Sequence, residues 1–341
     1  MSVKIKDIAS KANVSLATVS LVLNNKRGVS ETTKQKILKI AREMNYELPK
    51  SSYTGAQAKG IIKFLKIAKH GHTVNRDHDV FLADYIDGLA HEARENYYNL
   101  DIMAFSNKQM SEIIEIVENT HSDGVILLAT ELSFEDIRSF SRLDCPVIVI
   151  DSYYDFLNFD FVDMNNLDSV FQIVENLINN GHREIGFIRS PAEVQNFRLR
   201  EIGFKKSLKW CGIPYNEDYV FSVDSTFQGA YSDMLNILKR KSKLPTALFS
   251  SNDIIAYGCI KALKESGLHI PNDISLIGFD DLPMSSMMDP PLTTMLVNKT
   301  RIGRTAMKLL INRLENDPSM PPNKIVIGGE LIIRKSVKKI S

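Results

Sequence analysis

The stretch VSLATVSLVLNN, residues 14–25, decides how the first part of this chain folds. It follows a short helical pattern at residues 5–12, and the hydroxyl group of Ser15 can cap the free N–H groups at the start of a second helix. A third helical pattern begins after Ser30 and is amphipathic, with apolar residues at i, i+3, i+4 and i+7: Ile37, Ile40, Ala41 and Met44. Two helices joined by a short turn and supported by a third are typical of a helix-turn-helix headpiece, which we expect over residues 1–46.

The charge of the chain is unevenly distributed. The whole sequence of 341 residues has a net charge of +1, yet its first fifty residues carry ten Lys and Arg against four Asp and Glu. A small basic module of this kind is attracted to phosphate groups, whereas the rest of the chain has no general affinity for polyanions. With 44% hydrophobic residues, the chain is long enough to form two or three packed units.

Cysteine usage and the apolar runs indicate a cytoplasmic protein that does not enter a membrane. Cys145, Cys211 and Cys259 are far apart and form no Cys-x-x-Cys pair, as expected in a reducing compartment. The N-terminal sequence MSVKIKDIAS lacks the apolar core of a signal peptide, and no apolar run approaches the ~18 residues that span a bilayer. Common catalytic and phosphate-binding motifs are also missing, so we expect neither an enzyme nor a cofactor.

The remainder of the chain predicts two α/β lobes. Residues 47–60 are rich in Pro, Ser and Gly and indicate a linker. From residue 61 onward, short apolar runs alternate with amphipathic helical patterns, which is typical of parallel sheets covered on both faces. The predicted strands are 61–67, 100–105, 124–129, 146–151, 184–190, 219–224, 246–251 and 274–281. Helical patterns lie between them, for example at residues 83–96, 169–180 and 254–266.

The predicted core, residues 61–341, is too long for one ordinary domain, and residues 160–166 are a plausible crossing between two. We therefore expect two doubly wound lobes with a cleft between them. The N-terminal lobe comprises about residues 61–163 and 294–322, and the C-terminal lobe about residues 164–293 and 323–338. Ligands in such folds bind beyond the C-terminal ends of the strands.

Motifs along nearly the whole chain resemble those of the lactose/galactose repressor (LacI/GalR) family. They are the headpiece sequence at residues 5–46 and the later stretches VIVID, RLREIGF, SSNDIIAYG, ISLIGFDD and PPLTTM, in that family's order and approximate spacing. The resemblance implies a transcriptional repressor of carbohydrate uptake or catabolism, acting as a homodimer or a dimer of dimers on double-stranded DNA with a palindromic operator. It also implies a core of periplasmic-binding-protein type, in which a sugar or sugar derivative changes the lobe orientation.

The second helix of the headpiece presents few hydrogen-bonding groups for reading DNA. On a helical wheel, Val19, Val22 and Leu23 fall on a packed side. Apolar side chains on the opposite side can contact thymine methyl groups in the major groove. The alternative is that Leu16 and Leu21 are core residues; family members frequently have Arg at the position of Leu21. The expected DNA-contacting residues are Ser15, Leu16, Ala17, Thr18, Ser20, Leu21, Asn24 and Lys26.

The linker also departs from the family pattern. Family members usually have an Ala-x-x-Leu stretch whose Leu inserts into the minor groove, but no such Leu occurs between Pro49 and Gly60. Gly55 would weaken a helix here. Tyr53 is a candidate replacement for the inserted side chain, and a plain flexible tether is the alternative.

Four polar residues match family positions that bind the effector: Asp151, Arg200, Asn252 and Asp280. Carboxylates and an amide accept hydrogen bonds from sugar hydroxyls, and Arg donates a fixed pair, so this set suits a polyol. Helix capping and structural pairing are the alternative for Asp151 and Asp280. Phe81 and Phe227 are candidate platforms for the apolar face of a sugar ring, with core packing as the alternative.

Residues 66–81, KIAKHGHTVNRDHDVF, are unusual because the family has a short loop here. His70, His72 and His78, together with Asp77 and Asp79, could form a metal site, but their spacing fits no compact motif and a solvated loop is favoured. We therefore predict no metal site. A further hypothesis is that Lys66, Lys69 and His70 meet an anionic effector such as a sugar acid or sugar phosphate.

Two other classes of protein compete with the regulator. A solute-binding protein of periplasmic type would share the two-lobed core, but the basic headpiece and the missing signal peptide oppose it. A cytoplasmic α/β enzyme fused to a DNA-binding module would need a catalytic motif at a strand end, and the sequence contains none of the common ones.

Overall fold

The structure, a computed structural model, describes residues 5–12, 14–15, 18–19, 22, 29–44, 58–240, 243–316 and 319–340. The chain divides into two compact units, Met1–Gln57 and Ala58–Ser341. The division falls inside the segment predicted to be a linker. Among the helices in these ranges, none has the length and hydropathy needed to cross a bilayer.

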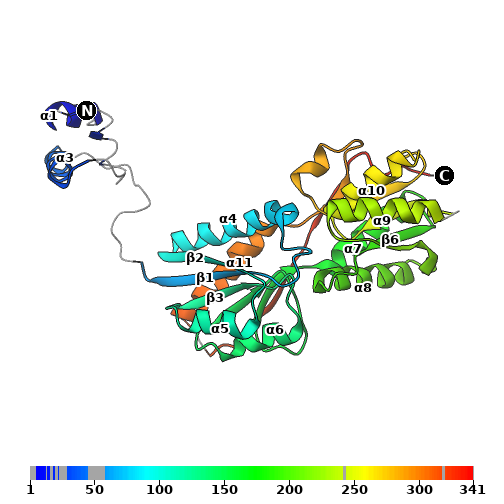
Figure 1. Cartoon of the computed structure of the whole chain (residues 1–341), viewed down its shortest axis with the longest axis horizontal. Helices are drawn as coiled ribbons and strands as arrows, with labels where there is room; N and C mark the ends of the chain where they lie inside the picture. Colours follow the sequence, from blue (N-terminus) through cyan, green and yellow to red (C-terminus); the bar gives the residue numbers. More distant parts are fainter. Residues whose placement is uncertain are drawn as a thin grey trace. The chain divides into compact units, whose positions relative to one another are not determined.

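The first unit contains a small core between α1 (Ile5–Ala12) and α3 (Glu31–Glu43) (Figure 1). Its buried side chains are Ile8, Ala9, Ala12, Val19, Val22, Ile37 and Ala41. The predicted cap is confirmed, because Ser15 Oγ accepts a hydrogen bond of 3.1 Å from the backbone N–H of Thr18. Burial of Val19 and Val22 confirms the packed side of the helical wheel. Leu23 lies outside the described residues.

The second unit contains two six-stranded sheets. The first has the order β11-β5-β4-β3-β1-β2 and the second the order β12-β10-β9-β8-β6-β7, and only the β10–β12 pair is antiparallel. Strands of the first sheet are β1 (Gly60–Ala68), β2 (Tyr98–Ser106), β3 (Gly124–Leu128), β4 (Val147–Ile150), β5 (Asp160–Met164) and β11 (Lys324–Ile327). Strands of the second sheet are β6 (Ile185–Arg189), β7 (Val220–Ser222), β8 (Ala247–Ser250), β9 (Ser275–Asp280), β10 (Thr293–Leu296) and β12 (Glu330–Ile332).

Helices cover both faces of each sheet, as Figure 1 shows. The N-terminal lobe carries α4 (Asp79–Glu95), α5 (Met110–Glu118), α6 (Phe134–Ser139) and α11 (Lys299–Glu315). The C-terminal lobe carries α7 (Asn166–Asn179), α8 (Gln195–Trp210), α9 (Phe227–Arg240) and α10 (Asp253–Glu265). Short 3-10 turns occur at Arg76–His78, Phe140–Arg142, Glu217–Tyr219 and Pro283–Ser286.

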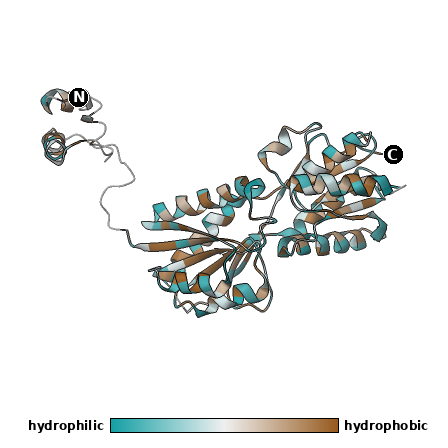
Figure 2. Cartoon of the chain, in the orientation of Figure 1, coloured by the Kyte–Doolittle hydropathy of each residue, from teal (hydrophilic) through white to brown (hydrophobic). Residues whose placement is uncertain are grey.

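The two faces of the first sheet bury different side chains. Along β3, Val125 and Leu127 join the core under α5 and α6, whereas Ile126 and Leu128 join the main core under α4 and α11. This alternation follows from the two-residue period of a strand. Figure 2 shows the result, with hydrophobic strands inside and hydrophilic residues on the outer surfaces of the helices. The predicted fold class, two doubly wound α/β lobes, is confirmed.

The structure corrects the predicted lobe boundaries. Strand β11 lies in residues assigned to the C-terminal lobe, but it pairs in parallel with β5 in the N-terminal sheet. Strand β10 begins at Thr293 and belongs to the C-terminal sheet through its whole length, so residues 294–296 were assigned to the wrong lobe. The crossing predicted at residues 160–166 begins with a strand, β5. Strand β11 pairs with a strand that lies about 160 residues before it in the sequence, and no local pattern specifies that partner.

Candidate functional site

The headpiece contains the candidate DNA interface. Of its predicted contact residues, the structure describes Ser15 and Thr18, whose hydroxyl groups lie 2.8 Å apart at the start of the second helix. Seven other predicted contacts, including the one in the linker, lie outside the described residues: Leu16, Ala17, Ser20, Leu21, Asn24, Lys26 and Tyr53. Their role in DNA binding therefore stays a prediction.

The second unit brings predicted effector residues together at the ends of its strands. Asp151 follows β4, Asp280 ends β9, and Asn252 caps α10 directly after β8. Arg200 reaches the same place from α8. Together with Phe81 on α4, they line one inner cavity of about 30 Å³, which also has Thr73, His78, Leu82, Thr130, Val194, Asn196 and Phe197 in its wall.

Two of these carboxylates are held on an unusual backbone. Asp151 has φ = 58° and Asp280 has φ = 111°, values that are uncommon for residues other than glycine. Such conformations persist only where the surrounding structure holds them, and they often occur at functional sites. Here they turn each strand end toward the cavity.

Asp151 is anchored from three directions. Its Oδ1 accepts a hydrogen bond of 2.9 Å from Tyr85 Oη, its Oδ2 accepts one from Thr130, and its backbone oxygen accepts one from Asn196. Burial raises the pKa of Asp151, although these hydrogen bonds oppose the shift. The side chain is therefore a fixed part of the cavity wall.

Arg200 of α8 contacts Asn166, the last residue of the predicted crossing at residues 160–166. It is 3% exposed, its Nε donates to Asn166 Oδ1 at 3.0 Å, and its Nη2 lies 3.4 Å from Asp280 Oδ1. The guanidinium group also lies over the ring of Phe279, 3.8 Å from its centre. Burial raises the pKa of Asp280 to about 7, against the opposing effect of Arg200.

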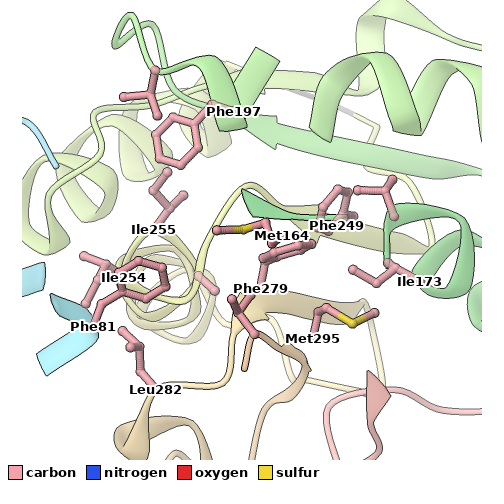
Figure 3. Close-up of a cluster of buried hydrophobic side chains, with 14 of the residues drawn as sticks. Phe81, Met164, Ile173, Phe197, Phe249, Ile254, Ile255, Phe279, Leu282 and Met295 are labelled. Atoms are coloured by element: carbon pink, nitrogen blue, oxygen red, sulfur yellow. The ribbon is translucent and has the colours of Figure 1, made fainter. Parts of the chain in front are cut away.

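Apolar side chains also line the inner cavity, among them Phe81 and Phe197, and Phe279 lies in the same buried cluster. Figure 3 shows Phe81, Phe197 and Phe279 within one cluster of buried side chains, to which both lobes contribute. The ammonium group of Lys299 lies 4.9 Å from the centre of the Phe81 ring and donates to the backbone oxygen of Asp280 at 2.8 Å. Phe227, the other predicted platform, is half-buried at the start of α9 and does not line this cavity.

A larger cavity of about 410 Å³ lies beside the inner one. The two share Val194 and Phe197, and the larger cavity is lined by residues of both lobes, including Lys69, His70 and Arg198. Its volume is in the range that holds a small-molecule ligand, whereas the inner cavity has room for only a few water molecules. The lobes therefore lie too close together for a sugar ring to enter the inner cavity.

The unusual segment 66–81 is an ordered wall of this cleft. Lys66 pairs with Asp79 at 2.7 Å and lines neither cavity, while Lys69 pairs with Asp136. No group of three or more metal-binding side chains occurs among the residues that the structure describes. The buried residue His78 instead contacts Asn252 in the other lobe.

Several residues of the site were not predicted from the sequence. Asn196 lies one helical turn before Arg200, so its spacing could have placed it on the same face of α8. Thr130 and Glu131 follow β3 just as Asp151 follows β4, and the rule for strand ends could have identified them. Tyr85 gave no such signal, because a tyrosine on the apolar face of a helix usually packs in the core.

These features define a class of protein: a basic helix-turn-helix headpiece joined to a two-lobed core with a polar cleft. Residues 4–48 match the family model for bacterial regulatory proteins of the lacI family, and residues 174–337 match the periplasmic binding protein-like domain.

Curated relatives match along the whole chain. A PurR transcriptional repressor of Haemophilus influenzae (strain PittEE) is 32% identical, with 98% of this chain and 99% of the relative covered. The CytR repressor of Escherichia coli (strain K12) is also 32% identical, covering 98% and 96%. The chain thus belongs to the LacI family of bacterial transcriptional regulators, as the sequence motifs implied, and not to a family of enzymes.

Solved structures share the fold. A lac repressor dimer bound to operator and the anti-inducer ONPF superimposes with a TM-score of 0.72 at 23% identity, covering 99% of this chain and all of the other. A complex of the regulator CelR with cellobiose gives a TM-score of 0.72 at 21% identity, covering 98% and 99%.

Proposed function

We propose that this protein is a cytoplasmic repressor of carbohydrate uptake or catabolism genes, and that a sugar or sugar derivative in the inter-lobe cleft controls its affinity for a palindromic operator. The observation that carries the proposal is the cavity itself. Asp151, Arg200, Asn252 and Asp280 come from four different elements and converge on one small space. Hydroxyl-rich ligands are recognised by such converging carboxylate, amide and guanidinium groups.

The chain is proposed to act as a homodimer or a dimer of dimers. A single headpiece reads one half-site, and two symmetric headpieces supply both affinity and a palindromic operator. Such pairing would cover large apolar side chains that are exposed on the N-terminal lobe: Val80 at the start of α4, Tyr97 in the turn before β2 and Ile102 on β2 are 52%, 58% and 47% exposed.

The sugar class is tested by heating the full-length protein with a panel of ribose, cellobiose, galactose, gluconate and glucose 6-phosphate. A ligand at 100 times its dissociation constant adds about 2.7 kcal/mol to the free energy of unfolding. We expect at least one neutral sugar to raise the melting temperature, and Asp280→Asn to abolish that rise. A panel without any shift would contradict the carbohydrate effector.

The regulatory role is tested with the same protein and DNA. An operator selected from random duplexes should be palindromic, and the sugar that stabilises the protein should change its affinity. An unchanged affinity at saturating sugar would show that the core binds a ligand without controlling the headpiece, as a solute-binding protein would.

A further inference from the structure

The segment at residues 69–78 is held rigidly against the N-terminal lobe by one buried carboxylate. Glu131 is 2% exposed, and its oxygens accept the backbone N–H groups of Lys69, His70, Gly71, Thr73 and Val74. Burial alone would raise the pKa of Glu131, but these hydrogen bonds lower it to about 2. The segment is therefore built as a fixed arm, not as a solvated loop.

Asn75 fixes the tautomer of His78 within this arm. The amide Nδ2 of Asn75 donates to the backbone oxygens of Gly71 and His72, so its Oδ1 must be the atom that faces His78 Nδ1 at 3.0 Å. Because this oxygen only accepts, His78 Nδ1 carries the proton and Nε2 has a free lone pair. Burial lowers the pKa of His78 to about 4, against the opposing effect of Asp77, so the ring is neutral.

The lone pair of His78 faces the other lobe. Asn252 Oδ1 accepts from the backbone N–H of Ile255, which turns Nδ2 of Asn252 toward His78 Nε2 at 3.2 Å. The arm makes a second contact across the cleft, where Ser225 Oγ donates to the backbone oxygen of His72 at 2.8 Å. His72 Nδ1 also lies 3.5 Å from Asp224 Oδ2. Three contacts thus join the arm to the C-terminal lobe.

We propose that His78 is a positioning residue of the effector site, which holds Asn252 and links the two lobes over the inner cavity. The inference rests on the proposed function, because it takes this cavity to be the place where the effector enters. A sugar hydroxyl both donates and accepts. It can therefore bridge the pair, donating to His78 Nε2 and accepting from Asn252 Nδ2, so that the effector would bind both lobes through these two side chains.

The test measures the distance between the lobes in the full-length protein without any ligand. Cys145 precedes β4 in the N-terminal lobe and Cys211 ends α8 in the C-terminal lobe, and both are half-buried, whereas Cys259 is buried. Spin labels on the first two cysteines report the inter-lobe distance by pulsed electron resonance. Co-expression with excess Cys145→Ser/Cys211→Ser protein dilutes the labels, so that distances within one subunit dominate.

We expect a short, narrow distance distribution for the wild type and a longer, broader one for His78→Ala. His78→Gln retains a side-chain acceptor for Asn252 and should restore much of the short distance. His91→Ala, at an exposed position on α4, is the matched control and should leave the distribution unchanged. Ser225→Ala should broaden it as well, because it removes the second contact.

Two results would overturn the inference. One is a His78→Ala distribution that coincides with the wild type, provided that circular dichroism shows a folded protein. The other is a nitrogen-15 spectrum in which Nε2 of His78, and not Nδ1, carries the proton. Neither measurement uses a sugar, so failure of the sugar panel would count against the proposed function and not against this contact.

Discussion

Asp163 is completely buried near the end of β5, next to Asp151 and Asn196, and its Oδ2 has no hydrogen-bond partner among the residues that the structure describes. Burial, followed by the nearby charge of Asp151, raises its pKa to about 8. The folded protein therefore keeps a proton on Asp163 that the unfolded chain releases above about pH 4. This carboxyl group should make the core less stable as the pH rises from about 4 to about 8.

An amide cannot ionise, so Asp163→Asn should remove this part of the pH dependence. We expect the variant to be more stable than the wild type at pH 8 by about 1 kcal/mol or more, with a smaller difference at pH 5. Urea unfolding of the full-length protein at the two pH values measures both free energies. Asp144→Asn, at an exposed position, is the control and should be as stable as the wild type at each of the two pH values. A pH-independent effect of Asp163→Asn would contradict the assignment.

At the scale of single residues, the sequence predicts side chains better where a strand ends than where a helix packs. Asp151 follows a strand of the first sheet, and Asn252 and Asp280 follow or end strands of the second. They come together because the carboxyl ends of the parallel strands of both sheets face the same cavity. Phe227 could not be placed in this way, since the rotation of a helix about its axis depends on packing that the sequence does not state. The sequence suggests His78 only as a possible metal ligand. Its partner in the structure is Asn252, 174 residues away, and no local pattern indicates that contact.

Helices α4 and α11 approach closely because each contributes a glycine at the contact. A Cβ atom added at Gly88 would lie 2.2 Å from the carbonyl oxygen of Thr300, and one added at Gly303 would lie 2.5 Å from that of Tyr85. Backbone atoms cannot move aside without shifting a whole helix. The contact also positions Tyr85, the hydrogen-bond donor to Asp151.

We expect Gly88→Ala to lower the free energy of unfolding by about 1–3 kcal/mol, the usual effect of overpacking. Thermal or urea unfolding of the full-length protein measures the change. Gly328→Ala is the matched control, because no atom lies within 4 Å of the added Cβ. If both variants unfolded at the same denaturant concentration, the close helix contact would be wrong.

The sequence of the second headpiece helix predicts contacts with thymine methyl groups, and this can be tested. If Ala17 and Leu21 contact thymine methyl groups, replacing thymine with uracil in each half-site should weaken binding by about 1 kcal/mol or more per contacted methyl. Titration of a selected operator, with and without the replacement, measures this loss. Uracil outside the half-sites is the control. Unchanged affinity would mean that this helix positions the protein and that specificity lies elsewhere.

At the scale of elements, each of the eight predicted strands is present, because continuous apolar runs mark buried parallel strands. Strand β5 was taken for a crossing, since Asp160 and Asp163 interrupt its apolar pattern. Both carboxylates are nevertheless buried, and Asp160 pairs with Arg313 of α11. Arg313, 153 residues away in sequence, neutralises the buried Asp160 carboxylate, and no local pattern indicates this partner.

The whole effector core depends on the last residues of the chain. Strands β11 and β12 each form one edge of a sheet. The segment after them also contacts the core, where Ser336 donates to Leu276 and accepts from Thr293. A chain that ends after Glu315 lacks both edge strands. We expect it to lose cooperative unfolding, as measured by circular dichroism during heating.

A chain that begins at Ala58 is the matching control, because it removes the separate headpiece unit and leaves the core complete. It should unfold at nearly the same temperature as the core of the full-length protein. Cooperative unfolding of the chain that ends after Glu315 would show that the lobes are stable without their edge strands.

The position of β11 and β12 also bears on how the chain is made. A ribosome releases β1 to β5 first, then β6 to β10 of the second lobe, and after these the two strands that finish the sheets, β11 and β12. Until then β5 and β10 present unpaired edges, which invite pairing with other nascent chains. Both sheets therefore stay incomplete until β11 and β12 have left the ribosome, and the two lobes become complete almost at the same time.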